Sequence, residues 1–271
     1  MTKNNKISRP IGLLDSGLGG LSVFREIEKQ IPQEQVVYFG DTAHAPYGEK
    51  TNEQIIDYVF SIIDFLVQKD VKMVIIACNT ATAVALDEAK KRFSLPIIGV
   101  IQPGANEATS KTKNRRIGII GTEVTIRNQS YEKLIKKINP AIATFSYPCS
   151  NQIIREMEEK ALRNEDVIRN LLKECLEPII NNDVDTLVLG CTHYPFLKKY
   201  IQELTKLAMC LVDPAKATVT QAKKIIEEHQ LMNAHKNKTN SFFISGDSDL
   251  FAKIAEKLLG YYPGDFHRVT L

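Results

Sequence analysis

The stretch MVIIACNTATAVAL, residues 73–86, joins an apolar strand to an amphipathic helix through a single cysteine. The apolar run ends at Cys78, and an amide and a hydroxyl side chain follow directly. Free cysteine is among the most buried residue types, so Cys78 by itself is interpreted as the last small residue of a core strand. A functional interpretation needs a second observation.

A second stretch, TLVLGCTHYPFLKK at residues 186–199, repeats this arrangement. In both stretches a strand ends in a small residue, and a cysteine and two polar residues come next. An apolar strand followed by a turn is also repeated, at IGLLDSGLGGL from Ile11 and at IGIIGTEVTI from Ile117. Because both pairs keep the same order, we interpret the chain as two similar halves, with Cys78 and Cys191 as a matched pair.

Short apolar runs alternate with segments of helical periodicity along the chain, which is typical of α/β proteins with largely parallel sheets. Residues 51–69 are predicted to be a helix because Ile55, Val59 and Ile62 recur on one side. We predict strands at residues 11–15, 36–40, 73–77, 96–100, 116–120, 144–147, 186–190, 210–213 and 242–245.

The repeat predicts two similar Rossmann-like or flavodoxin-like domains related by an approximate twofold axis. Ligands of parallel sheets bind beyond the carboxyl ends of the strands, where helix N-termini also point. We therefore expect an active site in the cleft between the domains, with Cys78 and Cys191 facing the same space.

The composition is that of a globular protein, with 271 residues, 44% hydrophobic residues and a net charge of +3. Basic residues are spread along the chain without aromatic interleaving, so nucleic-acid binding is not predicted. No secretion signal is recognised and no stretch approaches the roughly 18 apolar residues of a membrane helix, so we expect a soluble, cytoplasmic protein with no membrane contact. The polar segment 233–241 is predicted to be a surface loop.

The five cysteines are widely separated and contain no Cys-x-x-Cys pair. This spacing argues against a disulfide scaffold and against a structural zinc site. We predict that Cys149, Cys175 and Cys210 are packing or surface thiols.

Several chemistries are open to Cys78 and Cys191. A thiol at a helix N-terminus is expected to have a lowered pKa. A Cys191–His193 pair would suit hydrolysis or acyl transfer but leaves Cys78 without a function. Zinc held by these three residues would lack a fourth ligand, and a redox pair would lack the Cys-x-x-Cys signature.

Opposed thiols suit another reaction, in which one removes the α-proton of an amino acid and the other returns a proton to the opposite face. This reaction inverts the α-carbon. Because that carbon is a very weak acid, hydrogen-bond donors must stabilise the developing carbanion. The sequence offers such donors in Ser16, Asn79, Thr80, Thr122, Thr125, Thr192 and His193.

Taken together, six motifs resemble those of the cofactor-independent glutamate racemases in the aspartate/glutamate racemase superfamily, and the resemblance covers nearly the whole chain. The motifs are DSGLGGLSV (15–23), YFGDTAHAPYG (38–48), ACNTAT (77–82), GVIQPG (99–104), LGCTHYP (189–195) and SGDSDLFAKIAEKLLG (245–260).

The resemblance implies that Cys78 removes the α-proton of D-glutamate and Cys191 that of L-glutamate. It implies that Asp15 assists the first thiol and His193 the second, with Asp41 as an accessory acid near the site. The substrate-binding residues that it implies are Asp15, Ser16, Tyr47, Gly48, Asn79, Thr80, Thr192 and His193.

The resemblance also implies a reaction that needs neither a metal nor pyridoxal phosphate, and a product, D-glutamate, that feeds peptidoglycan synthesis. Members of the family are commonly homodimers. The domains that it implies are residues 1–104 plus 214–271, and residues 105–213.

The chain departs from the family pattern in two segments. In SNQIIREMEEK (150–160) the family's acidic position falls on Glu156 or on another residue. In GTEVTIRN (121–128), Val124 and Asn128 stand where glycine and serine are usual, which leaves a substrate contact from Thr125 open.

Other interpretations stay open. GLGG (17–20) fails the dinucleotide fingerprint because Ser22 takes the place of the third glycine, so we predict that these glycines bring backbone close to a small carboxylate. Asp15 would also suit a turn or helix cap. Alternative functions are a racemase of aspartate or another amino acid, a relative that uses one thiol, and a small-acid binding protein without catalysis.

Overall fold

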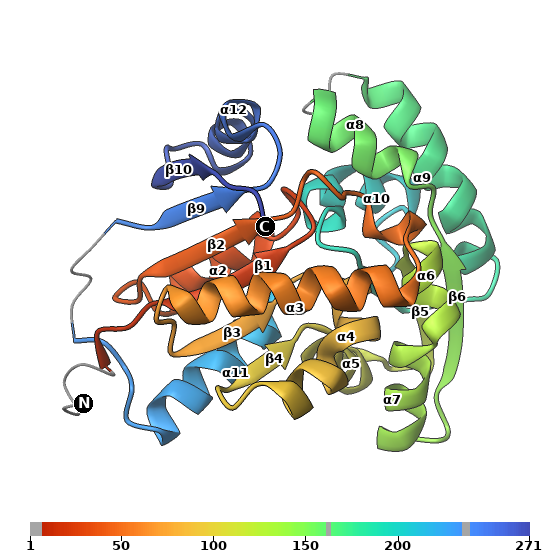
Figure 1. Cartoon of the computed structure of the whole chain (residues 1–271). Helices are drawn as coiled ribbons and strands as arrows, with labels where there is room; N and C mark the ends of the chain where they lie inside the picture. Colours follow the sequence, from red (N-terminus) through yellow and green to blue (C-terminus); the bar gives the residue numbers. More distant parts are fainter. Residues whose placement is uncertain (1–6, 161–163, 235–238) are drawn as a thin grey trace.

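The computed structural model describes residues 7–160, 164–234 and 239–271, and it contains two sheets whose paired strands all run parallel (Figure 1). In spatial order the first sheet holds β10 (Asp265–Arg268), β9 (Ser241–Ile244), β2 (Val36–Gly40), β1 (Ile11–Asp15), β3 (Met73–Ile76) and β4 (Ile97–Gly99). The second holds β6 (Ala143–Pro148), β5 (Arg116–Gly121), β7 (Thr186–Gly190) and β8 (Cys210–Val212). The predicted α/β class with parallel sheets is confirmed.

The repeat found in the sequence is present in the topology. The order β2-β1-β3-β4 in the first sheet matches β6-β5-β7-β8 in the second. Register matches too, because Ile11 is opposite Met73 and Ile117 is opposite Thr186. Cys78 follows Met73 by five positions, and Cys191 follows Thr186 by five positions. The two cysteines therefore leave their sheets at equivalent positions.

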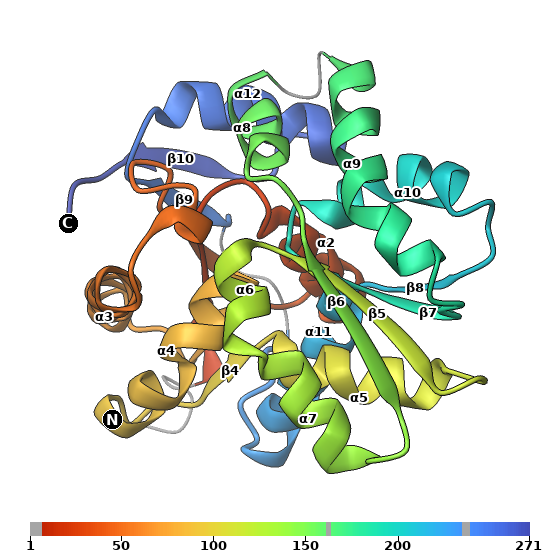
Figure 2. The same cartoon turned by 90° about the vertical axis from the view of Figure 1, so that its right-hand side faces the viewer.

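One hydrophobic core joins the two sheets. Side chains of β1, β5, β7 and β8 pack in it with the helices α2 (Leu21–Gln30), α5 (Ile101–Lys111) and α11 (Pro214–Glu228). Figure 2 shows α5 and α11 beside the second sheet, and α11 contacts both α2 and α5. The predicted domain boundaries stay a prediction.

Another set of helices covers the opposite faces of the two sheets. The first sheet packs against α3 (Asn52–Gln68) and α4 (Asn79–Arg92), and the second against α8 (Gln152–Lys160), α9 (Glu165–Ile180) and α10 (Lys198–Leu204). The other elements are α6 (Glu123–Asn128), α7 (Ser130–Ile138), α12 (Ser248–Leu259) and the 3-10 helices η1 (Tyr47–Glu49) and η2 (Tyr194–Leu197). Within the described residues no helix has the length and apolar character that crossing a membrane requires.

Local sequence signals account for most element ends. The helix predicted at residues 51–69 is α3, and it begins with a capping box in which Thr51 accepts from the backbone of Gln54 and Gln54 accepts from the backbone of Thr51. Strand β10 was not predicted. It is a polar, mostly exposed strand at the sheet edge, so it carries no apolar pattern.

The prediction of a surface loop at residues 233–241 is wrong at both ends of the segment, while residues 235–238 lie outside the described part of the chain. Asn233 is buried and donates from its backbone and side-chain nitrogens to Glu34, whose carboxylate also pairs with Lys72 at 2.5 Å. Asn240 is buried and accepts from the backbone of Val36 at 3.1 Å. Both residues are buried because they form hydrogen bonds with buried polar groups, the carboxylate of Glu34 and the backbone N–H of Val36.

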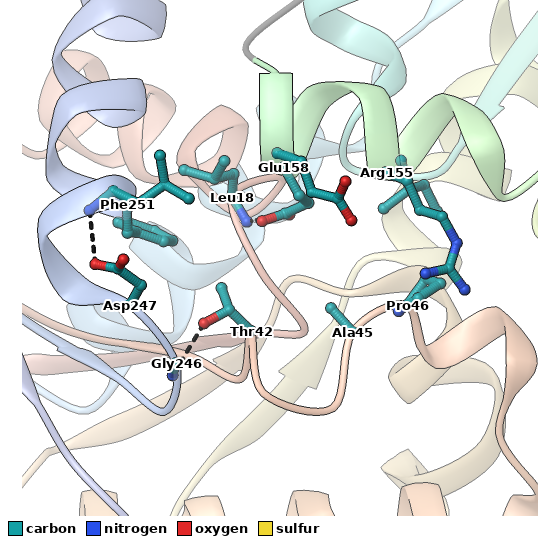
Figure 3. A pocket seen from close by; sticks show the side chains of 12 residues that line it. Leu18, Thr42, Ala45, Pro46, Arg155, Glu158, Gly246, Asp247 and Phe251 are labelled. Atoms are coloured by element: carbon teal, nitrogen blue, oxygen red, sulfur yellow. Dashed lines mark hydrogen bonds between the residues drawn. The ribbon is translucent and has the colours of Figure 1, made fainter.

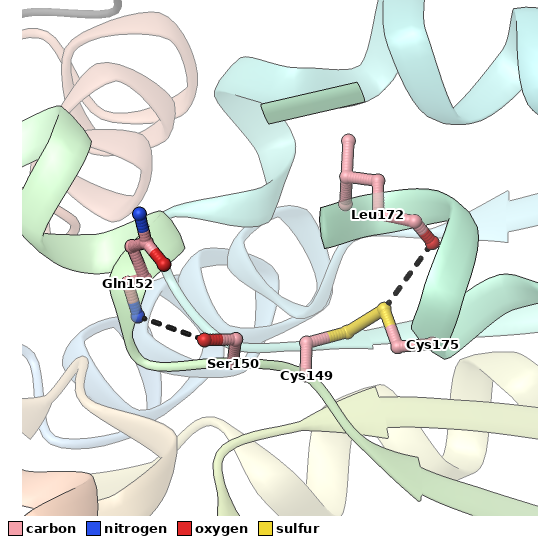
Figure 4. The surroundings of a disulfide bond; sticks show 5 residues. All are labelled: Cys149, Ser150, Gln152, Leu172 and Cys175. Carbon is pink, nitrogen blue, oxygen red and sulfur yellow. Dashed lines mark hydrogen bonds between the residues drawn. A yellow bond between two sulfur atoms is a disulfide. The ribbon is translucent and has the colours of Figure 1, made fainter. Parts of the chain in front are cut away.

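A second correction concerns the cysteines. Cys149 and Cys175, predicted to be packing or surface thiols, form a buried disulfide with an S–S distance of 2.09 Å, and Figure 4 shows it between the end of β6 and α9. Contact between β6 and α9 brings the Cα atoms of the two cysteines to 5.2 Å, which the spacing along the chain does not reveal. Cys210 is free and exposed, as predicted.

Candidate functional site

The loops that follow β1, β2, β3, β5 and β7 converge on one small cavity beyond the carboxyl ends of the strands. Cys78 and Cys191 both line it, and each has 5% of its surface exposed. The other lining residues are Ser16, Tyr47, Gly48, Asn79, Thr80, Thr122, Ile154, Thr192 and His193. The structure thus brings together most of the residues that the sequence singled out.

Three residues from the predicted set, Asp15, Thr125 and Asp41, are buried but do not line the cavity. One lining residue, Ile154 on α8, was not predicted. The cavity has a volume of about 10 Å³. A single water molecule needs roughly 10–15 Å³, so the cavity is about the size of one water. In this closed arrangement the side chains surround the space tightly.

Cys78 is the N-cap of α4 because β3 ends just before it and the helix starts at Asn79. Its Sγ accepts from the backbone N–H of Ala81 at 3.5 Å and donates to Oγ of Ser16 at 3.7 Å. Burial, with the charge of Asp15 added, raises the pKa of Cys78 to about 12 and outweighs both of these contacts. The expected lowering of its pKa by the helix N-terminus is therefore wrong, because desolvation is the larger effect.

Cys191 has different surroundings. Only the short η2 follows it, starting at Tyr194, and α10 begins later at Lys198, so no α-helix opens at this cysteine. Its Sγ lies 3.6 Å from Nδ1 of His193. On the other side of the ring, Nε2 of His193 lies 2.7 Å from Oε1 of Glu158. The imidazole thus bridges a thiol and a carboxylate.

This bridge determines the charge of His193. Burial alone would lower the pKa of His193, but its hydrogen bonds to Cys191 and Glu158 outweigh burial and hold the pKa well above its ordinary value. A protonated imidazole donates from both nitrogens, which fits acceptors on both sides. The charged ring therefore lies beside Sγ of Cys191.

Of the acidic residues in segment 150–160, Glu158 is the one whose carboxylate contacts His193. Its Oε1 also accepts from the backbone N–H of Leu18 at 2.6 Å, so it links α8 to the turn after β1. Glu156 lies on the same helix, two positions away and on another side. Glu158 and Ile154 are four positions apart on α8 and both line the outer pocket, but no pattern along the chain shows that this side of the helix faces the site.

Asp15 ends β1 and is fully buried. Its carboxylate accepts from the backbone N–H of Gly17 at 3.1 Å and from Oγ1 of Thr192 at 3.2 Å. Burial raises the pKa of Asp15 to about 6, although the charge of His193 and the Gly17 hydrogen bond oppose the shift. Asp15 therefore accepts from a turn, as the alternative interpretation proposed, and also contacts a residue that lines the cavity.

Asp41 holds Tyr47, which lines the cavity. The phenol of Tyr47 donates to Oδ2 of Asp41 at 2.6 Å, and Oδ1 of Asp41 accepts from Ser245 at 2.7 Å. Nδ1 of His44 also lies 2.9 Å from Oδ1. Asp41 thus lies behind the cavity and fixes a side chain of its wall.

A cluster of hydroxyls connects the two halves. Oγ1 of Thr80 lies 2.8 Å from Oγ1 of Thr122 and 3.2 Å from that of Thr125. Thr122 and Thr125 are themselves 3.0 Å apart, with Thr122 as the N-cap of α6. Thr125 therefore supports Thr80 and Thr122 from behind the cavity.

The glycines of residues 17–20 make room for protein side chains. A Cβ on Gly17 would lie 2.1 Å from Oε1 of Glu158, and one on Gly19 would lie 2.2 Å from Oγ1 of Thr192. We predicted that these glycines bring backbone close to a small carboxylate. At Gly17 that carboxylate is the side chain of Glu158 and not a bound ligand. A side chain at Gly17 would displace the Glu158 carboxylate, and one at Gly19 would displace the side chain of Thr192.

A larger pocket of about 190 Å³ adjoins the site (Figure 3). It lies between Arg155 and Glu158 of α8 on one side and the loop of Thr42, Ala45 and Pro46 with the start of α12 on the other. Ile154 lines this outer pocket as well as the inner cavity. Glu158 and Ile154 therefore separate the outer pocket from the two cysteines.

The arrangement places two thiols on one cavity and gives each a different partner for proton transfer. One thiol lies beside a serine and a buried carboxylate, and the other beside a charged imidazole. Among the described residues no three His, Cys, Asp or Glu side chains are grouped so that they would hold a metal ion. Such a site can remove a proton from one face of a small molecule and return a proton to the opposite face.

Comparison with known proteins identifies racemases as similar to this chain. The family model described as Asp/Glu/Hydantoin racemase matches residues 11–222. A glutamate racemase of Lactococcus lactis subsp. cremoris is 41% identical over 254 residues, which cover 93% of this chain and 92% of that protein.

Solved structures agree over the whole fold. The crystal structure of a glutamate racemase isoform from Bacillus anthracis has a TM-score of 0.92 and 36% identity, with 97% of this chain and 98% of that chain covered. A glutamate racemase from Francisella tularensis in complex with D-glutamate has a TM-score of 0.89 and 31% identity over the same shares. The resemblance found in the motifs is confirmed, and the chain belongs to the Asp/Glu/Hydantoin racemase family, with glutamate racemases as its similar relatives.

Proposed function

We propose that this chain is a glutamate racemase that interconverts L-glutamate and D-glutamate with two cysteines. The observation that carries the proposal is the position of Cys78 and Cys191, which leave register-matched strands and line the same cavity. The names of the relatives, and the D-glutamate in the Francisella structure, support glutamate as the substrate.

The two surroundings suggest how L-glutamate is inverted. Cys191, which lies beside the His193 imidazolium, acts as the thiolate base that removes the α-proton from L-glutamate. Cys78, whose raised pKa keeps it protonated at neutral pH, donates its proton to the opposite face and gives D-glutamate.

In the reverse direction the thiolate of Cys78 takes the α-proton of D-glutamate and Cys191 donates. For Cys78 to start as a thiolate its proton must pass to another group, and we assign Asp15 as the assisting carboxylate because its charge acts on this thiol. Backbone and side-chain donors at Ser16, Asn79, Thr80 and Thr192 would hold the substrate and stabilise the carbanion.

The same resemblance supports three further parts of the proposal: the chain would act without a cofactor, its D-glutamate would supply peptidoglycan synthesis, and it would assemble as a homodimer. From the sequence we further propose that it acts in the cytoplasm. Sedimentation velocity of the purified chain tests the homodimer, since a monomer at micromolar concentration would contradict it.

The reaction is tested by incubating the purified chain, freed of metal with EDTA, with L-glutamate in D2O. We expect the α-proton signal to disappear while optical rotation falls to zero, because each inversion brings in a solvent deuteron. Loss of the proton with retained rotation would indicate a single working base. Absence of both changes contradicts glutamate racemisation, and the same assay with L-aspartate tests the alternative substrate.

Cys78→Ser and Cys191→Ser are each expected to lower the rate of racemisation at least ~10³-fold, since a serine hydroxyl is a far weaker base than a thiolate. Cys210→Ser is the matched control because Cys210 is free and exposed, and its rate should stay within about twofold of the unmodified chain. Retained racemisation in either of the first two variants would refute the two-thiol scheme.

Glu158→Gln should lower the pKa of His193 and reduce kcat by about tenfold to a hundredfold, because the imidazolium loses its carboxylate partner. Glu159→Gln is the control on the same helix, since Glu159 lines the outer pocket only. NMR titration of the His193 ring and steady-state kinetics measure the two effects. An unchanged His193 pKa in Glu158→Gln would exclude the proposed bridge.

Asp15→Asn should slow racemisation and yet stabilise the fold above pH 6. With a pKa of about 6 in the fold and 3.8 as its ordinary value, Asp15 holds a proton in the folded chain that the unfolded chain has lost, so its contribution to stability falls as pH rises from about 4 to 6. Urea unfolding at pH 8 should show a free energy about 1–3 kcal/mol higher in the variant, with no difference near pH 3. Asp57→Asn, at an exposed position, is the control. An equal effect of both substitutions would contradict the raised pKa of Asp15.

A further inference from the structure

Tyr131 has no role in the scheme above, although it contacts a residue beside each catalytic cysteine. It lies in the first turn of α7 and only 1% of its surface is exposed. Its hydroxyl donates to Oδ1 of Asn79 at 2.7 Å, and Asn79 follows Cys78 directly. Its ring lies against Gly190, which precedes Cys191 directly.

The ring of Tyr131 occupies a slot between two glycines. A Cβ on Gly104 of α5 would lie 3.2 Å from Cε1 of the ring, and one on Gly190 would lie 3.5 Å from Cε2. The first distance is tighter than ordinary van der Waals contact, so a side chain at Gly104 would displace the ring or the helix. The slot therefore fixes the direction in which the phenol points.

The hydrogen bond of Tyr131 determines which end of the Asn79 amide faces the cavity. An asparagine side chain has one oxygen that accepts and one NH2 group that donates. Because Oδ1 is held by the phenol, Nδ2 is left for the cavity that Asn79 lines, and none of the described residues accepts from it. Burial, with the charge of Asp213 added, raises the pKa of Tyr131 well above its ordinary value, so the phenol remains a donor at neutral pH.

We propose that Tyr131 is a positioning residue, whose phenol holds the Asn79 amide so that its NH2 group donates to a carboxylate of the substrate beside Cys78. The inference rests on the proposed function, because it assigns a carboxylate-bearing amino acid to the cavity. With the amide reversed, its oxygen would face that carboxylate and repel it. Tyr131 acts from α7, on the half of the chain opposite to Asn79, so it fixes the amide only when the two halves are together.

Tyr131→Phe removes the hydroxyl and keeps the ring in its slot. We expect KM for D-glutamate and for L-glutamate to rise about tenfold while kcat changes less than about threefold, since the lost hydrogen bond orients a group that binds the substrate. Tyr194→Phe is the matched control. The Tyr194 hydroxyl is also buried but has no hydrogen-bond partner among the described residues, so KM should stay within about twofold.

A double-mutant cycle separates positioning from a general structural effect. If Tyr131 acts through Asn79, Tyr131→Phe should change KM less than about twofold in the Asn79→Ala background. An equal rise in KM in both backgrounds would overturn the inference, as would an unchanged KM in Tyr131→Phe alone. Circular dichroism melting of each variant shows whether it is folded.

A second measurement needs no substitution of Tyr131. The side-chain NH2 signals of Asn79 in the 15N spectrum of the unmodified chain, assigned by their loss in Asn79→Ala, should shift when D-glutamate is added. Signals that stay unchanged at saturating D-glutamate would overturn the inference. If the unmodified chain racemises glutamate and either test fails, only the role of Tyr131 is lost, whereas a chain that does not racemise glutamate contradicts the proposed function.

Discussion

The hydrophobic core shared by the two sheets is the constraint on which the site depends. Helices α2, α5 and α11 pack in this core with inward-facing residues of both sheets, so the carboxyl ends of β3 and β7 are brought to one space. Two thiols on separate sheets can line one cavity only if this packing fixes the distance between the sheets. Residues far from any chemistry, such as Ile117 and Val219, thereby determine whether Cys78 and Cys191 act on the same molecule.

Equivalent positions in the fold do not give the two thiols equivalent chemistry. Cys78 caps a helix, yet burial and the charge of Asp15 make its thiolate costly. Cys191 has no helix behind it and depends on the imidazole of His193, which Glu158 keeps charged. A symmetric fold with asymmetric side chains thus gives the two thiols different partners, a buried carboxylate for Cys78 and a charged imidazole for Cys191.

Residues near each other along the chain were predictable, and contacts between distant segments were not. Alternating apolar and helical segments predicted the strands and the sheet class, and the sequence repeat predicted the pairing of Cys78 with Cys191, because period and order along the chain carry that information. Glu158 was missed, since its role depends on how α8 packs against the turn at Leu18. The Cys149–Cys175 disulfide and the buried Asn233 were missed for the same reason, as each joins segments whose proximity exists only in the fold.

The direction of the Cys78 pKa shift shows a different limit. Helix position is readable from sequence and predicts a lowered pKa, whereas desolvation depends on how completely the two halves enclose the thiol. Enclosure is also what leaves a cavity of about 10 Å³, far smaller than an amino acid. Contacts across the site produce this enclosure: hydrogen bonds join Glu158 to Leu18, Thr80 to Thr122 and Thr192 to Asp15, and the side chain of Val124 packs in the core of the first half. The enclosure that raises the pKa of Cys78 thus depends on contacts between distant segments, which the order of residues along the chain does not reveal.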